Sequence, residues 1–288
     1  MQALRPLLLA LSLATAPIAF AAPSHSLDQY ELKPERAPQG QLVNYVKSNL
    51  DGSKRLVLSL YFAKPFEVEA LKVEGDGRYI ARVQAKLDPQ TLTATWMRSF
   101  NGLENGPGKE RLQMQMDGKP ERLTASVAGT QMPVAPSHLP AHVYNFDLSS
   151  LNLTLPLLKN PRADFEVGVI DPDFAAMRAR FKPNAGMMEG IFIDKGKASF
   201  RYLRDEELDG VPTHRFEVGG PAFGGVTGSL WVNAKDRLIE RFEHALPDNP
   251  DWKSFKLSRM SERAMDATAW EAFKAASVQR AMGLVEAE

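Results

Sequence analysis

Cysteine is absent from this chain of 288 residues. Its absence excludes thiol nucleophiles, thiolate zinc sites and cysteine-held iron–sulfur clusters. It also excludes disulfides, which small exported domains often need. A chain of this length can bury a sufficient core without them, so its stability has to come from packing.

Net charge is lacking as well, because 35 Lys and Arg residues balance 35 Asp and Glu residues. Without a basic excess, nothing in the composition favours nucleic acid as a partner. Long apolar runs are also missing after residue 21. A membrane-spanning helix needs about 20 consecutive apolar residues, so we expect no transmembrane segment in the mature protein.

The first 21 residues have the pattern of a secretory signal peptide. Met1–Arg5 is a short cationic start, Leu7–Ala16 is apolar, and Ala19-Phe20-Ala21 places small residues before a cleavage point. Such a segment is removed on export and takes no part in the fold. The sequence therefore predicts a soluble protein in the periplasm of a Gram-negative bacterium.

From Gly40 onward, apolar and polar residues alternate with a period of two. In Arg78–Leu87 the outward side chains are Arg82, Gln84 and Lys86, and only Ile80 breaks the pattern. Strands of this kind have one packed and one wet face, as in an antiparallel sheet. Lys54–Phe62 is apolar on both faces, which predicts a central strand that is covered on both sides.

Turn residues separate these runs at short intervals. The predicted hairpin connections are Asp51-Gly52, Gly75-Asp76-Gly77, Asp88-Pro89, Asp117-Gly118 and Asp209-Gly210. Since no helical pattern lies between most strands, the chain predicts a meander rather than βαβ units. The predicted fold is mainly β: a long curved antiparallel meander sheet, or incomplete barrel, with a C-terminal helix and a few short helices.

Two segments interrupt the alternation. Met132–Pro140 is rich in proline, and if it is a linker it places an internal boundary near residues 131–140. If it is a loop, residues 22–288 form a single β-rich domain, which we favour because β character resumes on both sides. Phe174–Arg180 is a candidate for a short helix.

The chain closes with a predicted helix over about residues 266–283. Asp266 or Thr268 is its candidate N-cap, and Trp270 and Phe273 begin a loose apolar stripe. The helix either covers one end of the sheet, which we favour, or binds a partner.

The sequence contains no motif that is typical of a particular enzymatic reaction. The chain has no His-Glu-x-x-His, no G-x-S-x-G elbow, no phosphate-binding loop and no dinucleotide fingerprint. His138 and His142 are four positions apart, but Pro140 forbids the helix that would align them on a metal. We therefore predict that the protein is not an enzyme and uses no cofactor.

The loop after His244 is the one candidate for chemistry. His244, Asp248 and Asp251 lie within eight positions of sequence, and a histidine with two carboxylates can bind a divalent cation or relay a proton. The same aspartates stand beside prolines, where they nucleate turns. We favour the turn and predict no metal site, with the metal or hydrolase site as the minority alternative.

A long antiparallel sheet curls as it twists, and an apolar concave face that is not filled leaves a cleft for a hydrophobic ligand. Met and aromatic side chains suit adaptable apolar pockets, although they suit an ordinary core equally well. The predicted ligand-facing residues are Leu92, Trp96, Met114, Met116, Phe200, Tyr202, Phe216 and Trp231.

Gly190–Leu257 carries a run of motifs that resembles a known superfamily. An acidic turn ends in Asp209-Gly210-Val211, a strand Gly228-Ser-Leu-Trp-Val follows, and Lys235-Asp236 makes the next turn. This order resembles the second half of the outer-membrane lipoprotein carrier and sorting proteins and their uncharacterised periplasmic relatives. The resemblance implies an incomplete β barrel whose apolar cavity, under helices, shields an acyl chain between membranes.

The chain departs from that pattern in two places. The lid helices of the carrier come early in its chain, whereas the clear helix here comes at the end, and Met132–Pro140 has no counterpart. The favoured hypothesis is an exported, non-enzymatic protein that binds or carries a hydrophobic or amphipathic molecule such as a lipid or a lipoprotein acyl chain. The alternatives are a structural or interaction module of an envelope assembly with a protein partner, and a hydrolase or metal-dependent enzyme at His244–Asp251.

Overall fold

The computed structural model describes residues 22–74, 80–103, 109–127, 130–143, 149–173, 192–245 and 254–281. The predicted signal peptide and the helix predicted over 174–180 lie outside these ranges. Within them, the helices are all too short or too polar to cross a membrane.

A single sheet of 15 strands dominates the molecule, in the order β11-β12-β13-β14-β15-β16-β17-β2-β3-β4-β5-β6-β7-β8-β9. The first half of the chain supplies β2 (Gln41–Asn49), β3 (Leu56–Lys64), β4 (Glu67–Glu74), β5 (Ile80–Leu87), β6 (Ala94–Asn101), β7 (Arg111–Lys119), β8 (Arg122–Val127) and β9 (Thr130–Val134). The second half supplies β11 (Ala141–Val143), β12 (Phe165–Pro172), β13 (Phe192–Leu208), β14 (Val211–Gly219), β15 (Gly228–Asn233), β16 (Ile239–His244) and β17 (Phe255–Ala264). Apart from the parallel pair β11 and β12, all neighbours are antiparallel.

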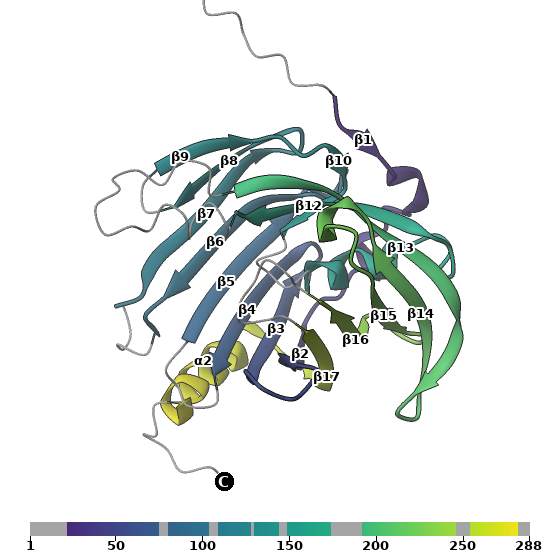
Figure 1. The fold of residues 1–288 in the computed structure, drawn as a ribbon. Helices are drawn as coiled ribbons and strands as arrows, with labels where there is room; N and C mark the ends of the chain where they lie inside the picture. The colour runs from purple at the N-terminus through teal and green to yellow at the C-terminus, as the bar shows by residue number, and fades with distance from the viewer. Residues whose placement is uncertain are drawn as a thin grey trace, which may run out of the picture.

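The sheet is strongly curved and is not closed into a barrel (Figure 1). Its two edge strands, β9 and β11, have no ladder between them in the described part of the chain. The ends of the sheet nevertheless approach each other, because the Phe192 amide at the start of β13 donates to the Met132 sulfur of β9 at 3.4 Å. The predicted fold class, a curved antiparallel meander that forms an incomplete barrel, is confirmed.

Hairpin turns join most of the strands. Asp209 and Gly210 form a two-residue turn with φ angles of 50° and 84°, which is the geometry that Asp-Gly favours between antiparallel strands. The predicted turn at Asp117-Gly118 was wrong, because β7 runs on to Lys119 and pairs Gly118 with Leu123. Glycine is needed there for close approach, since an added Cβ would meet the Arg122 carbonyl oxygen at 2.5 Å.

Strand β3 is covered on both faces, as its sequence predicts. Leu58, Leu60 and Phe62 point into the main core on the inner, concave face of the sheet. Tyr61 points to the outer face and belongs to a second buried cluster with Ile80. Ile80 breaks the alternation of its strand because its side chain is buried in this cluster, which means that another element packs on the outer face.

That cover is the helix α2 (Ala267–Ala281), which lies outside the sheet next to β3 and β4 (Figure 1). Asp266 is its N-cap, with Oδ1 accepting a hydrogen bond from the Ala269 amide at 2.8 Å. Trp270, only 1% exposed, stacks on Tyr61 at 5.2 Å and on Phe273 at 5.6 Å between ring centroids. The C-terminal helix thus covers the outer face of the sheet rather than its end.

Two short strands, β1 (Ser24–His25) and β10 (His138–Leu139), form a separate parallel pair. His138 on β10 is buried, with Nδ1 at 2.8 Å from the Ser24 hydroxyl and Nε2 at 3.1 Å from the Ser26 hydroxyl. Burial lowers the pKa of His138. These contacts give His138 a structural role in tying down the start of the described chain.

Candidate functional site

The predicted ligand-facing residues divide between the two faces of the sheet. Six lie at or in the main core on the inner face: Leu92, Met116, Phe200 and Phe216 are buried, and Met114 and Tyr202 are partly buried against them. Phe165 stacks flat on Phe200 at 4.4 Å and meets Phe216 edge-on at 5.5 Å. Sequence periodicity therefore located part of the inner apolar face.

The other two, Trp96 and Trp231, lie on the outer face, which corrects their predicted orientation. A bulge between the Leu87–Ala94 and Lys86–Trp96 pairs breaks the alternation of β6, so that Ala94 and Met97 enter the core. Trp96 instead packs under the cations of Lys86 and Arg98, at 5.6 and 4.8 Å from its ring centroid.

Trp231 alternates outward between Leu230 and Val232, both of which belong to the core. Its indole N–H donates to Glu206 Oε1 at 2.5 Å, and the Arg215 guanidinium lies 5.0 Å from its ring. Trp231 is thus buried on the outer side of the sheet beneath polar partners, with 7% of its surface exposed. This position removes it from any inner-face ligand site.

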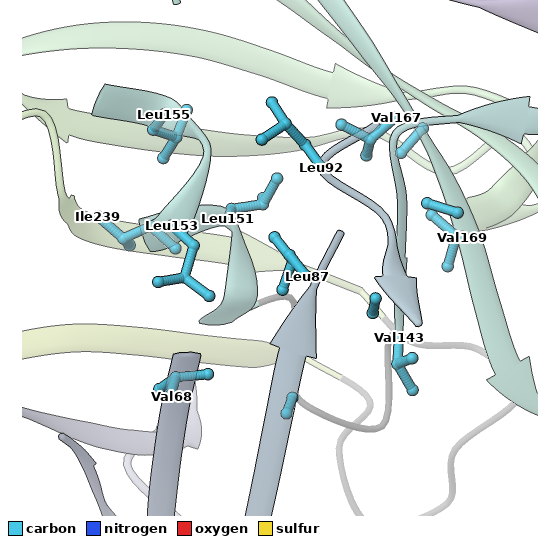
Figure 2. Close-up of a cluster of buried hydrophobic side chains, with 14 of the residues drawn as sticks. Val68, Leu87, Leu92, Val143, Leu151, Leu153, Leu155, Val167, Val169 and Ile239 are labelled. Carbon is cyan, nitrogen blue, oxygen red and sulfur yellow. The ribbon is translucent and has the colours of Figure 1, made fainter. Parts of the chain in front are cut away.

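A leucine-rich segment fills the inner face. Ser149–Leu153 and Leu155–Leu157 form two short 3-10 helices, and Leu151, Leu153, Leu155 and Leu157 are each at most 1% exposed. Figure 2 shows the first three of these leucines lying among side chains from β4, β5, β12 and β16. We call residues 149–158 the inner segment. Its leucines alternate along the sequence, but a short strand has the same pattern, so this pattern alone does not predict a buried 3-10 segment.

Asn152 is the main polar attachment of the inner segment. Its Oδ1 accepts hydrogen bonds from the Ile239 amide at 2.8 Å and from the Tyr45 hydroxyl at 3.2 Å, while its Nδ2 donates to the Ser149 carbonyl at 3.0 Å. Ile239 lies beside a register shift between β15 and β16 and before the first β16–β17 pair, Arg241–Ser258. Its amide takes the Asn152 side chain as its acceptor. Asn152 and its neighbours are fully buried, so each of these bonds replaces water that the core excludes.

His142 is the second attachment. Its Nδ1 lies 2.8 Å from the Ser150 hydroxyl and its Nε2 3.5 Å from the Thr154 hydroxyl, so strand β11 holds the inner segment at two points. Burial lowers the pKa of His142 to about 3, and the ring is neutral near pH 7. One of the two hydroxyls can donate to the ring nitrogen that has no proton, and the other can accept from the ring N–H. Both nitrogens of the neutral ring therefore have a hydrogen-bond partner.

The end of the inner segment is attached through its backbone. Arg237 donates to the carbonyls of Pro156 and Leu158, at 3.4 and 3.0 Å. Tyr30 and Leu158 form an isolated antiparallel bridge, with hydrogen bonds from Glu31 N to Leu157 O at 2.8 Å and from Lys159 N to Gln29 O at 3.0 Å.

The less favoured prediction was a metal or hydrolase site at His244, Asp248 and Asp251. Of these residues only His244 is described by the structure. His244 is buried, and its ring lies 4.1 Å from that of Phe223. Nε2 is 3.2 Å from the Val226 carbonyl oxygen, and Nδ1 contacts the carbonyl of Ala245. Burial lowers the pKa of His244, against the opposing effect of these carbonyls. Across the described ranges, no three His, Asp or Glu side chains are grouped to hold a metal.

Comparison with known proteins gives weak likenesses. No family model matches the chain, and no curated protein matches it either. Among solved structures, a Bacteroides fragilis protein described as exported, with a YmcC-like fold, is 12% identical over 79% of this chain and 97% of its own, with a TM-score of 0.27. A LolA superfamily protein from Nitrosomonas europaea is 13% identical over 81% of this chain and 92% of its own, with a TM-score of 0.27.

A Vibrio parahaemolyticus domain described as outer-membrane lipoprotein-sorting is 10% identical over 88% of this chain and all of its own, with a TM-score of 0.25. The similarity is low in both sequence and superposition, and the chain resembles these proteins only weakly.

Proposed function

We propose that this is an exported, non-enzymatic protein that binds an apolar or amphipathic molecule, such as a lipid or acyl chain, on the inner face of its open sheet. The observation that carries the proposal is the inner segment itself. An apolar concave face is covered there by a leucine-rich segment that belongs to neither the sheet nor an α-helix. In this proposal the inner segment occupies the ligand's place and withdraws when the ligand binds.

The energetics favour such an exchange over simple opening. Withdrawal alone would expose four leucines, each worth about 1.5–3 kcal/mol of burial. A ligand chain that takes their place covers the same apolar surface, so that term largely cancels. What remains is the loss of the hydrogen bonds to Asn152, His142 and Arg237, at about 1 kcal/mol net for each bond.

The absence of cysteine allows a direct test. Tyr30 and Leu158 face each other as a non-hydrogen-bonded antiparallel pair, because the bonds around them run between their neighbours. Such pairs have Cα atoms about 4.5–5.5 Å apart, within the range that a disulfide spans. Tyr30→Cys with Leu158→Cys would create the chain's one disulfide and fasten the inner segment.

We expect oxidation of the double variant to remove the inner-face site for a fluorescent acyl probe, 11-(dansylamino)undecanoate, so that fewer probe molecules bind per protein, and reduction with dithiothreitol to restore that site. The wild-type chain, with no cysteine, is the control and should not respond to the reductant. Equal binding by the oxidised and reduced forms would contradict the proposal, as would failure of the wild-type protein to bind acyl probes at all.

A further inference from the structure

A groove opens on the outer face of the sheet, alongside α2, which lines it from Ala269 to Ala281. It consists of two depressions of about 530 and 390 Å³ that share Asn44, Ser261, Phe273 and Arg280 in their lining. We call it the outer groove. Both volumes fall in the range of roughly 300–1,000 Å³ that is typical of small-molecule sites, and the sheet separates the groove from the inner segment.

The floor of the outer groove is apolar and exposed. Val57 on β3 and Met260 on β17 are 38% and 56% exposed, and both line the smaller depression together with Val73 and Phe273. Large apolar side chains gathered on an otherwise polar face mark an interaction site more often than single ones do.

The groove also carries a cation without a partner. Arg280 lines both depressions, and it makes no hydrogen bond or ion pair with the described residues. Arg263, beside it in the larger depression, lies over the Phe273 ring at 5.4 Å. Of the lining carboxylates, Glu262 is paired with Arg259, and Glu74 lines only the smaller depression. The larger depression therefore favours an anion.

Asn44 supplies a third feature, in the floor between the two depressions. Its Nδ2 donates to the Ser261 hydroxyl at 3.0 Å, whereas its buried Oδ1 has no hydrogen-bond partner. A buried acceptor without a donor costs about 1–3 kcal/mol.

We propose that the outer groove binds an anionic single-chain amphiphile, a second ligand site independent of the inner face. The acyl chain lies over Val57, Val73 and Met260 beside Phe273. The carboxylate or phosphate head pairs with Arg280 and Arg263.

One substitution with a matched control tests the chain part of the site. Met260→Glu puts a negative charge in the groove at an exposed position, so folding should be preserved. Leu112→Glu makes the same change at another exposed apolar residue, 48% exposed and not among the groove residues. Both changes are made in the oxidised Tyr30→Cys/Leu158→Cys protein, whose inner segment is fastened, so that the remaining binding reports on the outer groove. In that protein we expect the affinity for 11-(dansylamino)undecanoate to fall at least about tenfold with Met260→Glu and to stay unchanged with Leu112→Glu.

The head-group part is tested by competition between dodecanoate and dodecanol. Wild-type protein should prefer the acid by about tenfold, which is what one charge-assisted hydrogen bond contributes. Arg280→Ala should abolish that preference without changing the affinity for the alcohol, and Arg280→Lys should keep most of it. Equal affinity for acid and alcohol in the wild-type protein, or full binding by Met260→Glu, would overturn the proposal.

The two sites can be told apart in one set of samples. Binding that depends on Met260 but not on the Tyr30–Leu158 disulfide belongs to the outer groove. Binding that depends on the disulfide but not on Met260 belongs to the inner face and counts against the groove.

Discussion

The backbone amide of Ile239 donates its hydrogen bond to the side chain of Asn152, 87 positions earlier in the chain, rather than to a neighbouring strand. The contact joins β16 to the inner segment at a point that is completely buried. It shows that the segment completes the sheet's own hydrogen bonding, besides filling the concave face.

Asn152→Ala should therefore destabilise the protein by more than its small change in volume suggests. The substitution leaves the buried Ile239 amide without an acceptor, whereas the Tyr45 hydroxyl keeps the Ile239 carbonyl at 3.0 Å. We expect the free energy of unfolding to fall by about 1–3 kcal/mol. Urea denaturation followed by tryptophan fluorescence measures it. Gln113→Ala, at an exposed strand position, is the control and should change stability by less than about 0.5 kcal/mol.

The pKa of His142, lowered to about 3 by burial, makes stability depend on pH. Between the ordinary histidine pKa of about 6.5 and about 3, the unfolded chain binds a proton at this residue and the folded protein does not. Stability is therefore lost as pH falls through this window, by about 1.4 kcal/mol per pH unit from this one group. Other groups titrate in the same range, so the comparison must be with a variant.

Urea unfolding of the wild type and of His142→Gln at several pH values between 6 and 4 isolates the effect. The slope of the unfolding free energy against pH should be smaller in His142→Gln by the contribution of one titrating group, about 1.4 kcal/mol per pH unit. Parallel slopes would mean that His142 titrates normally in the folded protein.

Trp270 should account for most of the attachment of α2. Its ring is buried against Tyr61 and Phe273, so Trp270→Ala should lower the free energy of unfolding by about 3–5 kcal/mol. Near-ultraviolet circular dichroism should lose the signal of the stacked rings. Gln279→Ala, an exposed position on the same helix, should leave both measurements unchanged.

Two glycines of the same region should respond differently to alanine. A Cβ at Gly228 would meet the Glu243 carbonyl oxygen at 2.3 Å and His244 Cδ2 at 2.6 Å, whereas a Cβ at Gly219 would come no closer than 3.6 Å to Thr227. We expect Gly228→Ala to cost at least about 1–3 kcal/mol, and Gly219→Ala to be close to neutral. Thermal unfolding of the two variants side by side decides it, and equal midpoints would contradict the expectation.

Much of the fold could be predicted because its signals are local. Alternation and Asp-Gly turns predict strands and hairpins, and the N-cap at Asp266 predicts the start of α2. Orientation was predicted less well, because a single bulge reverses the side chains beyond it, as it does at Trp96 in β6. The inner segment could not be predicted, since its place inside the sheet depends on contacts with Tyr45, His142 and Ile239, which are distant in sequence.

The order of strands in the sheet has a consequence for how the chain folds. Read along the sheet, the strands follow the chain order except where β17 meets β2, and there the Met265 amide also donates to the Gly40 carbonyl at 2.9 Å. Nearly every strand can therefore pair with a neighbour that has just been synthesised. Only the β17–β2 junction requires both ends of the chain, and because closing so long a loop is slow, we expect it to be the last pairing to form and the step that limits the folding rate.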